Sequence, residues 1–368
     1  EALRASLAPM ENDLARLAAE LVRMDSRSAV SNLAVAERLV AELDGFEVER
    51  LDFTDPAGVP KCVIVAHKGG PGGIALSGHM DTVPDTGWTT NPWSGEIRDG
   101  VLHGLGSVDM KGPVAACVMA ARAAPRATLL LTTDEETTKQ GARLIAEQSA
   151  LARRAELRGI VVAEPTALTP VRGHRAHVLF TATAEGVQAH SSTGQGRNAN
   201  WALIPFLVEA RAVFERLRQD ETLQDPAYDP PFSDFNLVLD NHGTAVNVTV
   251  PRATARIKFR YSARVDPAPV VEAMRRAARA QGITLEEAYE GRPPELPEDH
   301  PLIRAAMRAT NAAPRTAPYG TDASELQALA PCVVLGPSVM VTAHTPHEHV
   351  PLDDLNRAVP VLRRLLDA

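Results

Sequence analysis

Short apolar runs constrain the fold of this 368-residue chain more than any other feature of its sequence. Four of these runs have strand length and no polar face, at residues 63–66, 74–76, 129–131 and 160–162. Such continuous runs are typical of strands that are buried on both faces of a largely parallel sheet. Segments with helical spacing lie between them, at residues 113–124 and 136–147. The alternation predicts an α/β domain in which helices flank a mixed, mostly parallel sheet.

A different pattern occupies the middle of the chain. It alternates between strand-like and helical segments in the order strand, helix, strand, strand, helix, at residues 178–183, 198–217, 235–239, 254–261 and 268–281. The α/β pattern then returns, with a helical segment at residues 301–311 and a strand-like run at residues 332–335. We therefore predict that a small α+β domain, residues 174–284, is inserted into a larger domain made of residues 1–173 and 285–368.

Charge and cysteine content exclude several classes of protein. The net charge of −8 at pH 7 argues against a nucleic-acid partner, because such proteins normally carry a basic surface. Cys62, Cys117 and Cys332 are widely spaced, which predicts buried thiols in a reducing compartment and no disulfide framework. The sequence has no signal-peptide pattern and no run of about 18 apolar residues, so we expect a cytoplasmic protein without a membrane partner.

Histidine and acidic residues follow the predicted strands. The segments at residues 74–77, 102–108, 129–133 and 160–163 lead into His79 and Asp81, into Asp109, into Glu135 and Glu136, and into Glu164. His344 is a further candidate, late in the chain. The carboxyl ends of parallel strands form the binding crevice of an α/β sheet, so these side chains are expected to converge there.

This set of side chains suits a pair of metal ions. Imidazole nitrogen and carboxylate oxygen are the ligands of zinc-class ions, and two such ions about 3.5–4 Å apart share a bridging carboxylate and a bridging water. Asp81 is placed to orient the imidazole of His79. Of the adjacent Glu135 and Glu136, one can bind metal while the other acts as general base. The simpler alternatives are a helix N-cap for Asp109 and a charged first helical turn for the two glutamates.

Four motifs resemble those of the di-zinc acylase and carboxypeptidase family, at residues 77–84, 104–112, 133–136 and 164–166. This family includes acetylornithine deacetylase, succinyl-diaminopimelate desuccinylase, aminoacylase and glutamate carboxypeptidases. The resemblance covers nearly the whole chain, and it implies a zinc exopeptidase-like catalytic domain with two bound zinc ions, or cobalt as the alternative. It implies that Asp109 bridges the ions, that His79 and Glu164 complete one site, that Glu136 and His344 complete the other, and that Glu135 activates the water. The family usually has Asn or Asp where His347 stands, so His347 remains an alternative ligand to His344.

The resemblance implies that the inserted domain is the lid of that family, which often also forms the interface of a homodimer. The resemblance implies that His190 stabilises an oxyanion, that Asn247 and Arg264 contact the substrate carboxylate, and that Gly320 belongs to a substrate loop. Three of these residues also have structural alternatives. His190 could be a lid histidine with satisfied hydrogen bonds, Asn247 could form a hydrogen bond at a strand edge, and Arg264 could form an ion pair on a strand face.

Residues 164–177 look most like the acetylornithine deacetylases of the family. The resemblance therefore implies hydrolysis of the amide bond of an N-acyl amino acid, and N-acetylornithine is the substrate that it favours. Glu135 would take a proton from the water and pass it to the leaving amine. The alternatives within the family are a succinyl-diaminopimelate desuccinylase and a carboxypeptidase or dipeptidase. The alternative outside enzymes is a module that binds an amino acid without catalysis.

Overall fold

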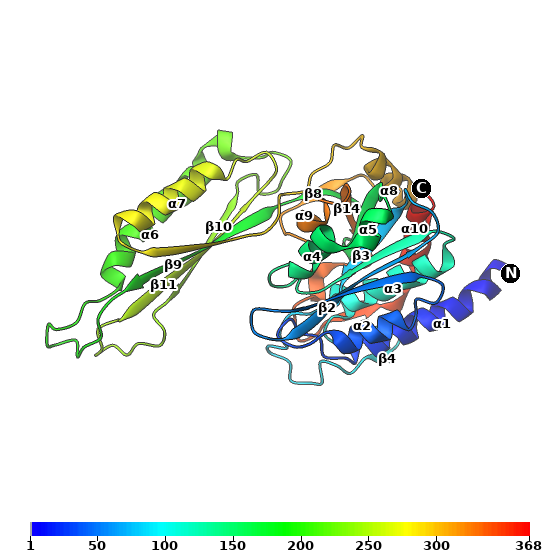
Figure 1. The fold of residues 1–368 in the computed structure, drawn as a ribbon, viewed down its shortest axis with the longest axis horizontal. Helices are drawn as coiled ribbons and strands as arrows, with labels where there is room; N and C mark the ends of the chain where they lie inside the picture. The colour runs from blue at the N-terminus through cyan, green and yellow to red at the C-terminus, as the bar shows by residue number, and fades with distance from the viewer. Residues whose placement is uncertain (1) are drawn as a thin grey trace. The chain divides into compact units, whose positions relative to one another are not determined.

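The computed structural model describes residues 2–368, with side chains from Glu11 onward, and these residues form two units (Figure 1). The first unit runs up to Gly173 and continues through Pro294–Arg315 and Thr321–Ala368. The second unit comprises His174–Pro293 and Thr316–Gly320. It extends beyond residue 284, the predicted end of the inserted segment, because the next residues form the edge strand β12 (Thr284–Tyr289) of its sheet.

An eight-stranded sheet organises the first unit, in the order β1-β2-β6-β3-β7-β14-β8-β13. The strands are β1 (Glu47–Thr54), β2 (Pro60–Lys68), β3 (Ile74–His79), β6 (Ala127–Thr132), β7 (Gly159–Pro165), β8 (Val171–His174), β13 (Arg315–Ala317) and β14 (Cys332–Gly336). The four central strands β6, β3, β7 and β14 run parallel, whereas β1, β2 and β8 pair antiparallel. Every residue of the central strands is buried, as their continuous apolar runs predict.

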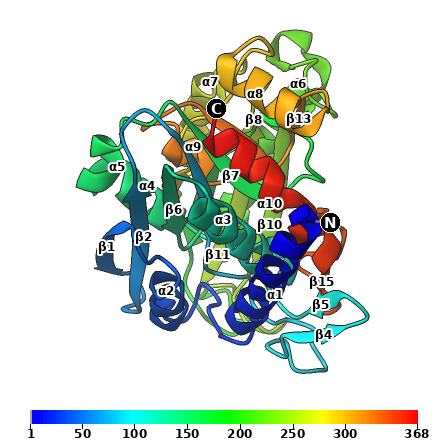
Figure 2. The ribbon, with the colours of Figure 1, turned by 90° about the vertical axis from the view of Figure 1, so that its right-hand side faces the viewer.

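Helices cover the sheet of the first unit. They are α1 (Ala2–Val22), α2 (Leu33–Val40), α3 (Gly112–Ala123), α4 (Gln140–Gln148), α5 (Ala150–Arg154), α8 (Pro301–Thr310), α9 (Ala323–Leu326) and α10 (Leu352–Leu366). Figure 2 shows α3 beside α1 and α10, and α3 also contacts β3, β6 and β7. Residues 112–121 of α3 are all buried, so this helix lies at the centre of the core rather than on its surface.

Helix α4 begins four residues later than the expected start at residue 136. The segment before it is a turn, in which Asp134 has a φ of 62° and its carbonyl accepts hydrogen bonds from the amides of Thr138 and Lys139. The helical spacing of the sequence does not reveal this turn. As a consequence, Glu135 and Glu136 lie on a turn at the end of β6 and not on a helix face.

The second unit is an antiparallel four-stranded sheet, in the order β10-β11-β9-β12, with two helices. Besides β12, its strands are β9 (Ala176–Glu185), β10 (Asp234–Asp240) and β11 (Arg252–Tyr261), and its helices are α6 (Asn200–Gln219) and α7 (Ala268–Ala280). Buried residues alternate along β9, which gives the sheet one apolar face. The helices α6 and α7 contact each other and lie on the same side of this sheet (Figure 1).

The first unit also contains a small antiparallel sheet that the sequence did not reveal, made of β15 (His349–Pro351), β5 (Val101–His103) and β4 (Glu96–Arg98). The thiols of Cys62, Cys117 and Cys332 are buried, as their sequence context predicts. Among residues 2–368, every helix is too short or too polar to span a lipid bilayer.

Candidate metal centre

The predicted ligands of the first unit meet at the carboxyl ends of the central strands. His79 is the last residue of β3, Glu164 lies next to the last residue of β7, and Glu136 follows β6. We expected a strand over residues 102–108 to lead directly into Asp109, and the structure differs from this expectation. Strand β5 ends at His103 and belongs to the small sheet, and Asp109 lies in the irregular turn Ser107–Lys111 that precedes α3. The turn places Asp109 beside His79 although no strand of the main sheet leads into it.

The carboxylate of Asp109 lies between two histidines. Its Oδ1 lies 3.1 Å from Nε2 of His79, and its Oδ2 lies 3.1 Å from Nε2 of His344. On the first side, Nε2 of His79 is also 3.8 Å from Oε1 of Glu164. On the second side, Nε2 of His344 is also 3.0 Å from Oε1 of Glu136. Each oxygen of Asp109 therefore belongs to a separate group of one imidazole and one further carboxylate, which is the arrangement of a bridging ligand between two ions.

Ligand-type atoms are close enough for metal binding in two overlapping groups. His79, Asp109 and Glu136 form one, and His79, Glu135 and Glu164 form the other, with all ligand atoms of a group within 4.8 Å of one another. His347 lies elsewhere, since its side chain lines a surface cavity together with Trp88 and His349. Of the two histidines that compete as ligands in the sequence, the structure thus brings His344 to the cluster.

The electrostatics of the cluster fit a metal ion. Burial raises the pKa of Glu136 to about 7 and the pKa of Glu164 well above its ordinary value, and the nearby carboxylate of Asp109 adds to both effects. Hydrogen bonds with Asp109 and Glu136 raise the pKa of His344 to about 11. These raised pKa values reflect an excess of closely spaced carboxylates, which favours the protonated forms of Glu136, Glu164 and His344. A divalent cation would supply compensating positive charge, so the donor set and its electrostatics suit metal binding.

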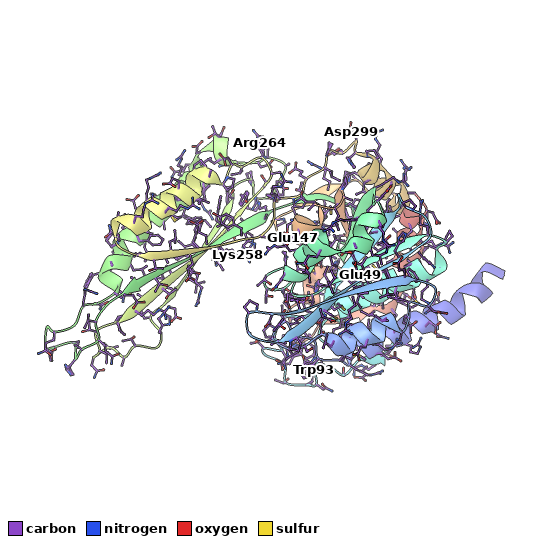
Figure 3. All side chains as sticks on the ribbon, in the orientation of Figure 1. Glu49, Trp93, Glu147, Lys258, Arg264 and Asp299 are labelled. Atoms are coloured by element: carbon purple, nitrogen blue, oxygen red, sulfur yellow. The ribbon has the colours of Figure 1, made fainter. Side chains whose placement is uncertain are left out.

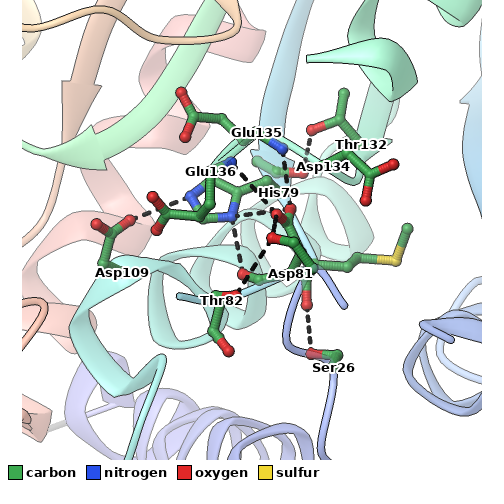
Figure 4. A network of polar contacts seen from close by, with 12 residues as sticks. Ser26, His79, Asp81, Thr82, Asp109, Thr132, Asp134, Glu135 and Glu136 are labelled. Carbon is green, nitrogen blue, oxygen red and sulfur yellow. Dashed lines mark hydrogen bonds and ion pairs between the residues drawn. The ribbon is translucent and has the colours of Figure 1, made fainter. Parts of the chain in front are cut away.

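Asp81 holds the two glutamates and the first histidine in place. It is fully buried, and its carboxylate accepts hydrogen bonds from the backbone amides of Glu135 (3.2 Å) and Glu136 (3.3 Å). Its backbone carbonyl lies 3.0 Å from Nδ1 of His79 (Figure 4). When Nδ1–H of His79 donates to this carbonyl, Nε2 keeps its lone pair for a metal ion, which is how backbone carbonyls commonly orient metal-binding histidines.

Glu135 has a partner that sequence reasoning missed. The carboxylate of Glu135 is 9% exposed and forms an ion pair with the ammonium group of Lys139, which also donates to the Glu135 carbonyl at 3.3 Å. The available signal was the spacing of four residues between an acid and a lysine, which often brings the two together. Lys139 thereby fixes the carboxylate of Glu135, which lies within 4.8 Å of the ligand atoms of His79 and Glu164.

Glu348 is a second residue that sequence reasoning missed. Its side chain is 1% exposed, and its Oε1 accepts hydrogen bonds of 3.0 Å from the amides of both Val108 and Asp109. The only signal in the sequence was an acid four residues after His344. Glu348 therefore fixes the backbone of the bridging residue from the opposite end of the chain.

The remaining predicted residues belong to the second unit, where their roles stay predictions. His190 is exposed, and its Nδ1 lies 2.8 Å from the hydroxyl of Ser192. Asn247 is exposed, and its carbonyl accepts a hydrogen bond from the amide of Ser191. Arg264 is exposed on the turn after β11 (Figure 3), and Gly320 packs close to the carboxylate of Glu290.

Two guanidinium groups line one cavity in the second unit. Arg175 is 3% exposed, and its Nε has no hydrogen-bond partner among the described residues. Arg260 lines the same cavity of about 350 Å³ and pairs with Asp234 at 2.7 Å. A buried guanidinium with an unused donor is suited to a carboxylate ligand.

The chain is similar to known enzymes over nearly its whole length. Residues 75–368 match the model of peptidase family M20/M25/M40. An acetylornithine deacetylase of Myxococcus xanthus is 33% identical over 94% of both chains. In structure, the dipeptidase Dug1p of Saccharomyces cerevisiae superposes with a TM-score of 0.76 at 15% identity, with 99% of each chain covered.

A further solved structure shares both the fold and the family. The YXEP protein of Bacillus subtilis, described as a dinuclear metal-binding peptidase of family M20, superposes with a TM-score of 0.65 at 16% identity and 98% coverage of both chains. This structural similarity shows the fold. Membership of the family is shown by the match to the family model together with the 33% identity to the Myxococcus xanthus enzyme. The chain is a metal-dependent hydrolase that belongs to peptidase family M20/M25/M40.

Proposed function

We propose that this enzyme hydrolyses the amide bond of an N-acyl amino acid, and that N-acetylornithine is its preferred substrate. The observation that carries the proposal is the buried Glu135 beside the cluster in which Asp109 separates His79 from His344. The relative of 33% identity that is named acetylornithine deacetylase supports the choice of acyl group and amino acid. A cytoplasmic location remains a prediction.

The chemistry follows from the placement of the side chains. Two divalent ions, of which zinc is the expected metal, would be held by His79, Asp109, Glu136, Glu164 and His344. When bound, they would polarise the amide carbonyl and acidify the attacking water. Glu135 accepts the proton of that water through its carboxylate and delivers it to the nitrogen of the leaving amine. Asp81 keeps Glu135 in reach by accepting the hydrogen bond from its backbone amide.

Residues of the second unit are proposed to recognise the substrate. The exposed His190 would donate to the oxyanion that develops on the amide oxygen. Asn247, Arg264 and the Gly320 loop are proposed contacts of the amino-acid part. The cavity lined by Arg175 and Arg260 is a further candidate for the carboxylate, because guanidinium groups bind carboxylates in a fixed, two-pronged geometry.

We also propose a homodimer through the second unit. Trp201, Ile204 and Val208 lie at helical spacing on α6 and are 73%, 46% and 61% exposed. Strand β10, at the edge of its sheet, exposes a run of three apolar residues at positions 237–239. An exposed apolar edge strand is a site for pairing with a second chain. Light scattering should show a dimer that Trp201→Glu and Val238→Glu convert to a monomer, whereas Glu298→Lys in the first unit leaves it intact.

The decisive experiment measures kcat/KM for N-acetylornithine, N-acetylcitrulline, N-succinyl-diaminopimelate and several dipeptides, together with the metal content of the same sample. N-Acetylornithine should be the best substrate by at least about tenfold, a difference of roughly 1.4 kcal/mol. Comparable rates for all substrates would overturn that assignment, and a faster desuccinylation or dipeptide cleavage would select the corresponding alternative.

A variant separates catalysis from binding. Glu135→Gln should lower kcat by about 10²–10⁴ with unchanged metal content, because it removes the proton acceptor and keeps the shape of the side chain. Glu147→Gln, at an exposed position on α4, is the matched control and should retain full activity. If the metal-loaded wild type binds N-acyl amino acids but hydrolyses none of them, the protein is a binding module.

A further inference from the structure

A row of possible metal ligands crosses the small sheet of the first unit and uses none of the residues of the candidate metal centre. In this sheet, His349 of β15 lies directly opposite His103 of β5, and His103 lies directly opposite Glu96 of β4. Side chains at directly paired positions of neighbouring strands point to the same face and lie close together. Three ligand-type side chains from three strands therefore share one face.

The two imidazoles are at the separation that a shared ion requires. The ring centres of His103 and His349 are 5.7 Å apart, and the ring planes are inclined by 34°. Two imidazoles that bind one zinc-class ion through nitrogens at about 2.0–2.1 Å place their ring centres roughly 5–6 Å apart in a tetrahedral site. The observed separation thus requires only small side-chain rotations to bring both nitrogens onto one ion.

His349 is already oriented in the manner of a metal ligand. Its Nδ1 lies 2.7 Å from the backbone carbonyl of His347, to which it can donate a hydrogen bond. That bond leaves Nε2 with its lone pair, and metal-binding histidines commonly donate their second nitrogen to a carbonyl in this way. The carboxylate of the neighbouring Glu348 is already engaged, since it accepts a hydrogen bond from the amide of Asp109.

The row opens onto a surface cavity. His103, His349 and Glu96 line a cavity of about 540 Å³, together with His347 and Trp88. Glu96 is 54% exposed and its contact with Arg98 is 3.6 Å long. An exposed ion pair of this kind contributes little to stability, so Glu96 can leave Arg98 at small cost. An ion can therefore reach the row from solvent and recruit Glu96.

We propose that His103 and His349 bind one divalent ion of the zinc class, with Glu96 as third ligand and water in the remaining position. Two imidazoles and one carboxylate are a ligand set that zinc-class ions accept in proteins. The site uses none of the residues around Asp109, so it would bind its ion whether or not the proposed deacylation is correct.

The test counts ions on the intact protein. After removal of metal by chelator and equilibration with excess zinc, desalted wild-type protein should retain one zinc per chain more than His349→Gln or His103→Gln. Each variant should also weaken binding of the additional ion at least tenfold in a zinc titration. His242→Gln, which removes a histidine from the second unit, is the control and should retain the wild-type count.

The two variants change different strands, so a folding defect in one does not decide the result. Copper(II) bound at the additional site should show nitrogen hyperfine coupling from two imidazoles, reduced to one imidazole in either variant. Equal zinc counts in the wild type and both folded variants would overturn the proposal, as would a copper spectrum that neither substitution changes.

Discussion

The side chain of Glu348 accepts a 3.0 Å hydrogen bond from the backbone amide of Asp109, from 239 positions further along the chain. The same oxygen accepts the amide of Val108, so removal of this carboxylate leaves two buried amides without a partner. Glu348→Ala should therefore lower the free energy of unfolding by about 2–4 kcal/mol, whereas Glu348→Gln, which keeps an acceptor oxygen, should cost less. Urea denaturation of both variants measures this, with the exposed Glu298→Ala as control. An equal decrease in the free energy of unfolding for Glu348→Ala and Glu348→Gln would contradict the assigned hydrogen bonds.

The two histidines near the end of the chain should differ in metal content. When the protein is loaded with excess zinc and desalted, His344→Asn should retain one ion fewer than the wild type, because Asp109 and Glu136 lose their shared imidazole partner. His347→Asn should retain the wild-type number of ions, since its side chain lines a surface cavity. Metal analysis of the two variants decides the point. Loss of an ion from the His347 variant alone would show that His347 is the ligand.

Metal affinity should fall as the pH is lowered. In the metal-free protein, the pKa of Glu136 is raised to about 7 and that of His344 to about 11, so both groups hold protons at pH 6. An ion binds only the deprotonated groups, and each competing proton below its pKa weakens apparent affinity about tenfold per pH unit. We expect affinity to weaken at least about tenfold per unit between pH 8 and pH 6.

Proton release tests the same prediction directly. Calorimetric titrations with zinc in buffers of different ionisation enthalpy should report more protons released per ion at pH 6 than at pH 8. A pH-independent affinity would mean that Glu136 and His344 do not bind the ion.

Gly336 is a position where a single methyl group should disrupt the site. A Cβ at this residue of β14 would lie 2.1 Å from the carbonyl oxygen of Ala163 and 2.5 Å from that of Glu164, both on the neighbouring strand. Backbone cannot yield easily at such distances, so Gly336→Ala should destabilise the protein by about 1–3 kcal/mol or more and weaken metal binding through Glu164. Gly70→Ala, where no atom lies within 4 Å, is the control and should change neither the melting temperature nor the metal content.

The parts of the structure that the sequence predicts well are those with a strong local signal. The central strands follow from continuous apolar runs, and the metal-type residues His79, Glu136 and Glu164 follow from their place at strand ends. What the sequence could not show depends on contacts between distant segments or on local backbone conformations that apolar spacing does not encode. The support of Asp109 by Glu348 links two turns, and the late start of α4 depends on the backbone conformation of Asp134. The exposed face of β10 and α6 was also hidden, because apolar spacing does not say which face is covered.

The order of the ligands along the chain has a consequence for how the protein is made. His79, Asp109, Glu136 and Glu164 precede the second unit in the sequence, and His344 follows it. On the ribosome, the donors around His79 are therefore complete before the second unit is synthesised. The donors of the other metal position are complete only after the second unit has been synthesised, because His344 follows it. A nascent chain that stalls within the second unit has the donors for one ion and lacks the histidine for the other.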